Sequence, residues 1–185
     1  MIKIGIDPSI NNTGICVWES DKDINKYYMI PSKMTKKMTL FNHNSINILP
    51  YTKREVKGLE YSEKEQFKFD NIYDICKLIG NILDLFNPGE IYMEGVSYGS
   101  VGSAALVDLC FLNAAIRSEI VRRNLKYTIV SPTSLKKFAC ANGQAEKNVI
   151  IDAWRRLDKN IKDVRDIKID DLADSFFLAH YEPTS

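Results

Sequence analysis

The chain has 185 residues, 45% of them hydrophobic and 26% charged, with a formal net charge of +1 at pH 7. This length and composition fit one soluble globular domain over residues 1–185, with enough apolar residues for a sizeable core. No apolar run approaches the roughly 20 residues of a membrane-spanning helix, so we expect no membrane partner. The near-neutral charge neither supports nor excludes a nucleic-acid partner, because local patches matter more than totals.

Strands are predicted at the start of the chain. Ile2, Ile4 and Ile6 alternate with other residues as in a strand, and Pro8 ends it because proline cannot donate to a ladder. The turn residues of PSINNTG then lead into a second strand, GICVWES, and the segment INKYYMI predicts a third. The polar, lysine-rich residues 31–64 predict a long irregular connection with a short extra strand at SINILPY, and such connections are usually functional or mobile.

The rest of the chain alternates helices and strands. Apolar residues recur at helical spacing in long segments, and Asn-Pro-Gly or Asn-Gly sequences end two of the helices. This order predicts an α/β layer architecture in which helices cover a central sheet. The predicted elements are a helix at 63–86, a strand at 90–95, a helix at 100–124 capped by Ser100 or Ser103, a strand at 126–131, and helices at 132–141, 145–157 and 170–181.

The cysteines and the N-terminal residues indicate in which compartment the protein is found. Cys16, Cys76, Cys110 and Cys140 are scattered in apolar stretches without CxxC spacing, which favours reduced core thiols in an intracellular protein. The chain starts directly with a predicted strand and shows no signal-peptide pattern. We therefore expect a cytoplasmic protein.

Carboxylates interrupt the apolar pattern at three places. Asp7 ends the first strand, Glu94 ends the strand IYME, and a group of aspartates begins the apolar helix at 170–181. Each has an ordinary alternative explanation: Asp7 could cap the turn, Glu94 could be a surface acid, and the aspartates could cap the helix. Taken together they favour a shared site, since buried carboxylates are costly unless paired or bound to a cation.

The spacing of the aspartates and the chemistry of carboxylates indicate which cation such a site would bind. Asp171 and Asp174 are three residues apart and share one helix face, although Asp170 and Asp174, four apart, would also serve. Hard oxygen ligands select Mg²⁺ or Mn²⁺. Two such ions about 4 Å apart form the usual clamp for in-line phosphodiester displacement.

Four segments resemble the signatures of one enzyme family. IGIDPSINNTG, IYMEGVSYG, DDLADSFFLAHY and SLKKFACANGQAEKNVII look like those of the RuvC-type Holliday junction resolvases of the RNase H-like superfamily. DDLADSF is also similar to the poxvirus enzymes, and the compact chain is similar to those of bacteriophages. The resemblance implies a five-stranded mixed RNase H-like sheet flanked by helices, a homodimer, two Mg²⁺ ions per active site (or Mn²⁺ in their place), and paired nicking of four-way DNA junctions. If the source is a bacterium, we expect the protein in the bacterial cytoplasm. If the source is a phage or another virus, we expect it in the cytoplasm of the host cell.

The resemblance also assigns residues. Asp7, Glu94, Asp171 and Asp174 match the family's catalytic metal ligands, which leaves Asp170 as a helix cap. Lys136 and Lys147 match two family lysines, and Lys147 could stabilise charge on the scissile phosphate. The family's junction-wedging aromatic falls on Ser97, with Tyr98 beside it. Residues 31–64 are longer than the family usually shows at this place and could contact DNA.

Basic residues after the last predicted strand are candidates for phosphate contacts, which give salt-sensitive and sequence-independent affinity. Acids interleave with them, so a solvated mixed-charge helix face is the alternative, and we favour it for residues 159–168. The two histidines are interpreted as packing residues. The candidate DNA-binding residues are Lys136, Lys137, Lys147, Arg155, Ser97 and Tyr98.

Dimerisation also has a basis in the residues. The helix predicted at 100–124 is apolar around much of its circumference, so more than one packed face is expected. The apolar residues around it include Leu106, Leu109, Cys110, Leu112 and Ile116.

Other functions remain open at this point. An actin-like sugar kinase or ATPase also carries an aspartate in its first hairpin, but it needs a second lobe and about twice this length, and we expect no nucleotide cofactor. A catalytically idle junction-binding module is a second alternative, and a nuclease for other branched or displaced-strand DNA is a third. We favour a metal-dependent endonuclease that resolves Holliday junctions, with other branched DNA as a candidate second substrate.

Overall fold

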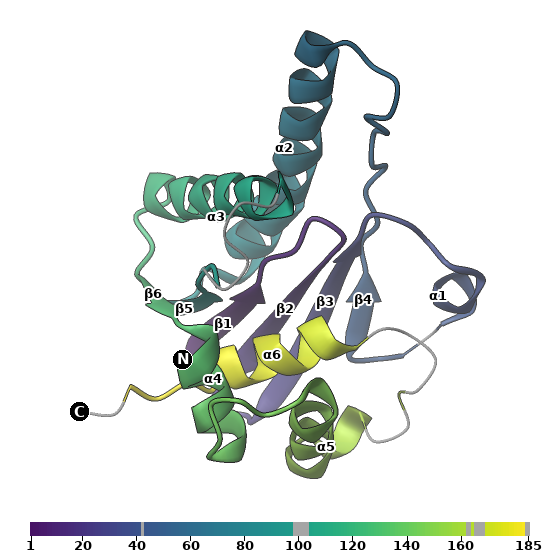
Figure 1. Cartoon of the computed structure of the whole chain (residues 1–185). Coiled ribbons are helices and arrows are strands. Elements are labelled where there is room, and N and C mark those ends of the chain that lie inside the picture. The colour runs from purple at the N-terminus through teal and green to yellow at the C-terminus, as the bar shows by residue number, and fades with distance from the viewer. Residues whose placement is uncertain (42, 98–103, 162–163, 165–168, 184–185) are drawn as a thin grey trace.

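The computed structural model describes residues 1–41, 43–97, 104–161, 164 and 169–183. Its centre is a mixed six-stranded sheet in the order β4-β3-β2-β1-β5-β6 (Figure 1). The first three strands form an antiparallel meander, and the other three each run parallel to the neighbour on which they pack. The strands are β1 (Ile2–Asp7), β2 (Asn12–Glu19), β3 (Ile24–Pro31), β4 (Ile46–Ile48), β5 (Glu90–Glu94) and β6 (Tyr127–Val130).

Helices cover both faces of the sheet, as the sequence predicts. On one face α2 and α3 pack over Ile4 and Ile6 of β1, and on the other α4, α5 and α6 pack over Cys16 and Tyr27 (Figure 1). The alternation of β2 divides its side chains between the two cores, with Ile15 and Val17 on the α2 and α3 side and Cys16 on the other. The helices are α1 (Lys36–Leu40), α2 (Tyr61–Phe86), α3 (Ala104–Arg122), α4 (Pro132–Cys140), α5 (Lys147–Leu157), the 3₁₀ helix η2 (Lys159–Ile161) and α6 (Asp170–Ala179).

The α/β class is confirmed, but the count of five strands is wrong. The sixth strand is β4, which lies within the predicted extra strand SINILPY and pairs with β3 at the edge of the sheet. The short helix α1 was not predicted, because its five residues are too few to show a helical period.

The predicted signals at the start of α4 and at the end of α2 agree with the structure. Ser131 caps α4, its side chain accepting a hydrogen bond from the Ser134 amide, and Pro132 begins the helix. Asn87 ends α2 in the left-handed conformation. The predicted caps Ser100 and Ser103 lie outside the described residues.

Two further expectations can be compared with the structure. All four cysteines are free thiols, but Cys110 is exposed on α3 and so does not belong to the core. Within the described part of the chain, no helix is both long enough and apolar enough to cross a membrane.

Helix α6 lies directly on β1 and β2 because two glycines leave room for its backbone. A Cβ atom on Gly5 would lie 2.1 Å from the Ser175 carbonyl oxygen, and one on Gly14 would lie 2.1 Å from the Asp171 carbonyl oxygen. Any larger residue would push the helix off the sheet. The two glycines therefore set the height of α6, and with it the position of the aspartates in its first turns.

We expect Gly5→Ala to destabilise the fold by about 1–3 kcal/mol, because its methyl group would overlap helix backbone that cannot move locally. Urea unfolding followed by circular dichroism measures this. The matched control is Gly89→Ala, whose Cβ would lie 3.3 Å from the flexible Met1 side chain and 3.7 Å from the Ile2 carbonyl oxygen. Equal stability of the two variants would contradict the proposed seating of α6.

Candidate active site

Two predicted acids meet at one end of the sheet. Strands β1 and β5 are parallel neighbours in which Ile6 pairs with Met93, so Asp7 and Glu94 are the next residues on adjacent strands. Asp7 is 7% exposed, and Glu94 is half-buried. Their carboxyl groups form a hydrogen bond with each other, which requires one proton between them. The sheet therefore brings together two residues that are 87 positions apart in the sequence.

Helix α6 brings Asp171 and Asp174 to the same place. The Asp171 backbone lies against Gly14 of β2, and the Asp171 and Asp174 charges both act on Asp7. Asp171 accepts a 2.5 Å hydrogen bond from the Asn12 side-chain amide. All four carboxylates that the sequence selects thus converge on one site.

Asn12 is a site residue that the sequence analysis missed. It is 5% exposed and follows the turn after β1, and its Nδ2 atom donates to Asp171. Its Oδ1 atom is buried and has no hydrogen-bond partner within the described structure. The only signal in the sequence was a second asparagine in the turn PSINNTG, and asparagine is common in turns for conformational reasons.

Burial and the charges of neighbouring acids raise the pKa values of Asp7, Glu94 and Asp174. Burial raises the pKa of Asp7 well above its usual value, and the charges of Glu94, Asp171 and Asp174 raise it further. Burial, followed by the charges of Glu94 and Asp171, raises the pKa of Asp174 to about 7. The pKa of Glu94 is raised by burial, while the hydrogen bond from Asp7 opposes the rise.

Two lysines supply positive charge beside the acids. The charges of Lys136 and Lys147 both lower the pKa of Glu94, which places both predicted lysines at the site. Lys147 is the first residue of α5, and its Nζ atom lies 2.6 Å from the Asp170 carboxylate. This ion pair raises the pKa of Lys147.

Asp170 does not cap the helix, contrary to the prediction. The N-cap position is Ile169, and Asp170 is buried within the first turn, where it forms the ion pair with Lys147. A cap must precede the first helical residue, and here the helix begins one residue earlier than the prediction assumed.

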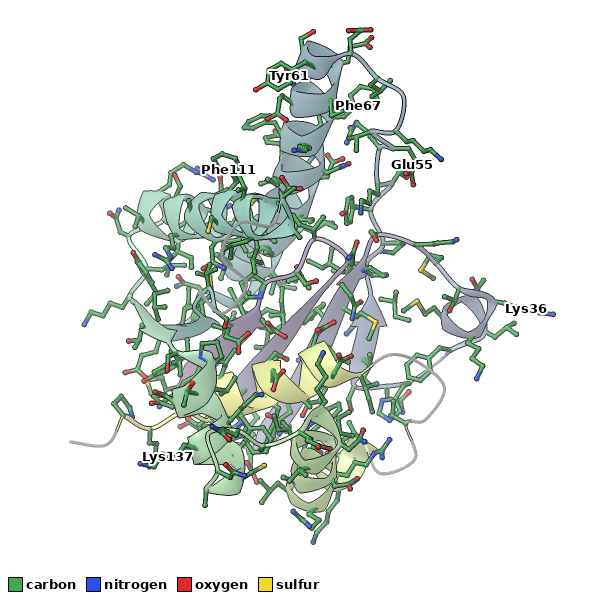
Figure 2. All side chains as sticks on the ribbon, viewed as in Figure 1. Lys36, Glu55, Tyr61, Phe67, Phe111 and Lys137 are labelled. Carbon is green, nitrogen blue, oxygen red and sulfur yellow. The ribbon has the colours of Figure 1, made fainter. Side chains whose placement is uncertain are left out.

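The other residues predicted to contact DNA differ in their exposure and in their contacts within the chain. Lys137 is exposed on α4 (Figure 2), and Ser97 is exposed after β5. Arg155 donates a 2.9 Å hydrogen bond to the Val164 carbonyl, which gives it a structural role in holding the chain after η2. Tyr98 lies outside the described residues, as does much of 159–168. DNA contacts by these residues stay predictions.

The donor set suits a hard divalent cation. Four carboxylates and the buried Asn12 Oδ1 atom are oxygen donors of the type that Mg²⁺ prefers, and their repulsion is the kind that a cation relieves. No three Asp, Glu, His or Cys side chains of the described residues are arranged as a ready metal-binding group. Asn12 also donates a hydrogen bond to one oxygen of Asp171.

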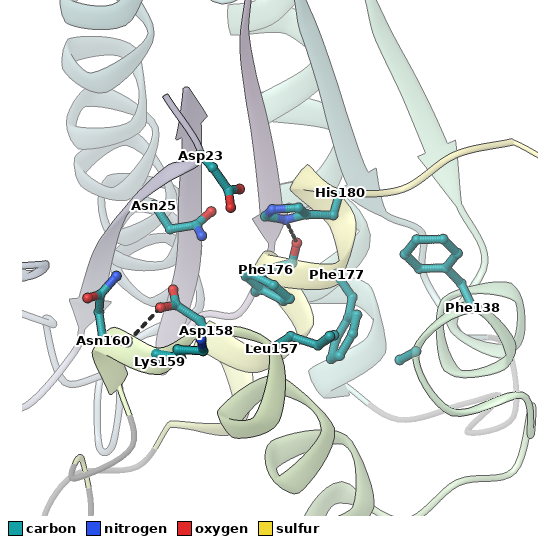
Figure 3. Close-up of a pocket in the computed structure, with 11 residues that line it drawn as sticks. Asp23, Asn25, Phe138, Leu157, Asp158, Lys159, Asn160, Phe176, Phe177 and His180 are labelled. Carbon is teal, nitrogen blue, oxygen red and sulfur yellow. Dashed lines mark hydrogen bonds between the residues drawn. The ribbon is translucent and has the colours of Figure 1, made fainter. Parts of the chain in front are cut away.

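A cavity of about 590 Å³ lies at the other end of α6, away from the carboxylates (Figure 3). Phe176, Phe177 and His180 line it from α6, and Asp158 from the end of α5. His180 stacks on Trp18 with a ring separation of 4.1 Å, and burial lowers the pKa of its imidazole. His180 therefore has the packing role predicted for it.

The strand order, with acids at the ends of β1 and β5, superposes on that of RuvC, so the fold is RuvC-like, as the motifs predicted. RuvC of Thermus thermophilus superposes with a TM-score of 0.58 at 16% identity, over 97% of this chain and 91% of RuvC. T. thermophilus RuvC in complex with a Holliday junction substrate superposes with a TM-score of 0.62 at 12% identity, over 97% of this chain and 90% of RuvC. The yeast mitochondrial Holliday junction resolvase Ydc2 superposes with a TM-score of 0.54 at 16% identity, over 96% of this chain and 75% of Ydc2.

Likeness at this level of identity concerns the fold. No protein-family model matches the chain, and no curated protein matches it either.

We expect the stability of the metal-free chain to fall as the pH rises from 3.8 to about 7. Folded Asp174 keeps its proton up to about pH 7, whereas an unfolded aspartate loses it near 3.8, so the folded state binds more protons in this window. Asp174→Asn should therefore raise the Tm measured in EDTA at pH 8 and flatten its pH dependence.

The exposed Asp152 on α5 provides the control, since Asp152→Asn should leave the pH dependence as it is. Adding Mg²⁺ at pH 8 should raise the Tm of the wild-type chain more than that of Asp174→Asn, because ligands that bind only the folded state stabilise it. A lower Tm for Asp174→Asn than for the wild-type chain in EDTA at pH 8 would show that these carboxylates do not repel one another.

Proposed function

We propose that this chain is a divalent-metal-dependent endonuclease that resolves four-way DNA junctions. The observation that carries the proposal is the convergence of Asp7, Glu94, Asp171 and Asp174 at one end of the sheet. The fold likeness to resolvases from a bacterium and from yeast mitochondria supports the choice of substrate. The proposed cofactor is Mg²⁺, two ions per active site, with Mn²⁺ as a substitute.

The residues divide into an acidic and a basic set around the proposed site. Asp7 and Glu94 stand on rigid strands and Asp171 and Asp174 on one helix, so the oxygens would hold cations in a fixed geometry. Bound ions would supply the charge that activates water and offsets the leaving oxygen. Asn12 orients Asp171 through its hydrogen bond. Lys136 and Lys147 place positive charge where a scissile phosphate would approach.

Cleavage of a fluorescent four-way junction tests the proposal. We expect the wild-type chain to make paired nicks with Mg²⁺ and none in EDTA. Asp7→Asn and Glu94→Gln should each lower the cleavage rate by at least about 100-fold, because each removes a metal-binding charge at a reacting centre. Both variants should still bind the junction in a gel-shift assay.

Three outcomes distinguish the alternatives. Mg²⁺-dependent nicking by both purified variants would falsify the proposed active site. Binding by the wild-type chain without any nicking would indicate a junction-binding module. Faster cleavage of flaps or displaced strands than of four-way junctions would indicate a nuclease for other branched DNA.

We further propose that the chain acts as a homodimer through α3. Residues at positions 107, 111, 114, 118 and 121 are all exposed and recur at heptad spacing along one side of the helix (Figure 2 labels Phe111). Val107, Phe111 and Val121 are 51%, 58% and 56% exposed. By contrast, Leu112 and Ile116 belong to the chain's own core. The helix thus has an inner and an outer apolar face, as the sequence suggested.

We expect Phe111→Glu to give a monomer, because it places a charge at the centre of this outer face. Sedimentation at micromolar concentration measures the mass. The variant should fold, since Phe111 is outside the core, and it should nick junctions on one strand without paired cuts. Two further variants test whether the position of the charge matters. Ser118→Glu places it on the same exposed side of α3 and should also weaken the dimer, whereas Lys126→Glu places it outside the helix and should not. A wild-type chain that is monomeric at this concentration would overturn the proposal.

A further inference from the structure

Residues 49–57, hereafter the strap, lead from the edge strand β4 towards α2 and pass beside the turn that follows Asp7 (Figure 1). The strap has no regular structure, yet its backbone is held at three points. The Leu49 amide donates to the Met29 carbonyl (2.8 Å), and the Tyr51 amide donates to the Pro31 carbonyl (3.3 Å). The Arg54 amide donates to the Asn71 side chain of α2 (2.8 Å). The segment is therefore fixed against the sheet at one end and against α2 at the other.

Two side chains of the strap contact the turn between β1 and β2. The buried Tyr51 donates its hydroxyl hydrogen to the Ile10 carbonyl at 2.5 Å. Lys53 donates to the Asn11 side-chain oxygen at 3.0 Å. Asn11 lies between the catalytic Asp7 and Asn12, which binds Asp171. The strap thus supports the loop that joins two parts of the proposed active site.

A groove begins at this contact and leads away from the site. One hollow of about 310 Å³ lies between Pro8–Asn11, Lys53 and the start of α3. A second hollow, of about 170 Å³, continues between the strap and α2. Ile10, Lys53 and Asp108 line both hollows, so the two lie side by side. Pro8, which lines the first hollow, directly follows Asp7 in the chain, so the groove begins at the turn after this acid.

The basic residues of the groove differ in their partners, and the exposed Glu55 adds an acid to the lining of the second hollow. Arg54 is neutralised by Asp74 at 2.7 Å, and Lys68 by Glu65 at 3.2 Å and Asp108 at 3.5 Å. Lys53, in contrast, contacts the neutral amide of Asn11. A lysine bonded to a neutral acceptor keeps its full charge for an anion and exchanges that partner at little cost. Its backbone lies between two anchored residues, which places this charge at a fixed distance from the catalytic turn.

We propose that the groove is a binding site for the DNA backbone beside the active site, with Lys53 contacting a phosphate of the strand that enters it. This inference rests on the proposed nuclease function and extends it to the segment that precedes α2. Tyr51 acts as a positioning residue, since its hydroxyl holds the strap to the catalytic turn.

Junction affinity as a function of salt tests the proposal. Binding is measured by fluorescence anisotropy with Mg²⁺ in a Glu94→Gln background, so that the labelled four-way junction stays intact. Adding Lys53→Ala should weaken binding at every salt concentration and lower the slope of log K against log salt by about 0.9, the value for one phosphate contact. Lys53→Arg should restore most of the slope.

Lys57→Ala is the matched control, because Lys57 is an exposed lysine of the same strap and lines neither hollow. It should leave the slope within error of the background. In the cleaving chain, Lys53→Ala should raise KM with kcat unchanged, whereas Tyr51→Phe should lower kcat because it loosens the turn that carries Asp7 and Asn12. The Tm of each variant confirms that it folds.

Each outcome decides between the two proposals. Equal slopes for Lys53→Ala and Lys57→Ala, in a background that binds the junction, overturn the phosphate contact and leave the nuclease proposal standing. A Glu94→Gln chain that does not bind the junction at all, together with a wild-type chain that does not cut it, overturns both. A loss of slope for Lys53→Ala alone supports the groove.

Discussion

Buried carboxylates that share one end of the sheet repel one another, and this repulsion is the constraint on which the site depends. Parallel pairing of β1 and β5 forces Asp7 beside Glu94, and α6 adds Asp171 and Asp174. In the chain alone, one proton between Asp7 and Glu94 relieves part of the strain. The fold tolerates this arrangement because the sheet and α6 carry two apolar cores whose burial outweighs it. Such a conflict between stability and local charge is expected at functional sites.

The acids can be close only because the helix backbone is close. Gly5 and Gly14 allow α6 to rest on β1 and β2 without side chains between them. Asn12 then reaches Asp171, and Lys147 reaches Asp170 from the start of α5. Backbone contact therefore comes first, and the polar contacts that orient the carboxylates follow from it.

The sequence predicted the α/β class and the four carboxylates, because each acid interrupts an apolar pattern that is visible along the chain. The resemblance to the resolvase motifs selected Asp171 over Asp170, and the ion pair with Lys147 gives Asp170 a separate role. Strand β4 and helix α1 are too short to show a periodic pattern of apolar residues in the sequence. Strand β4 forms because its backbone can pair with the free edge of β3. Asn12 escaped notice since its role depends on a contact with a residue 159 positions away. Properties that arise from the approach of distant segments leave little trace in a local pattern.

The strap shows how an irregular segment can be both fixed and available for binding. Its amides are bonded to β3 and α2, so the entropy cost of holding Lys53 in place has been met by folding before any ligand arrives. Tyr51 and Lys53 meet the same turn that separates Asp7 from Asn12. A strand bound along the groove would therefore be held in register with the carboxylates by the contacts that stabilise the turn itself. Binding and the geometry of the proposed reaction would then depend on one set of hydrogen bonds, and a change in either is expected to affect the other.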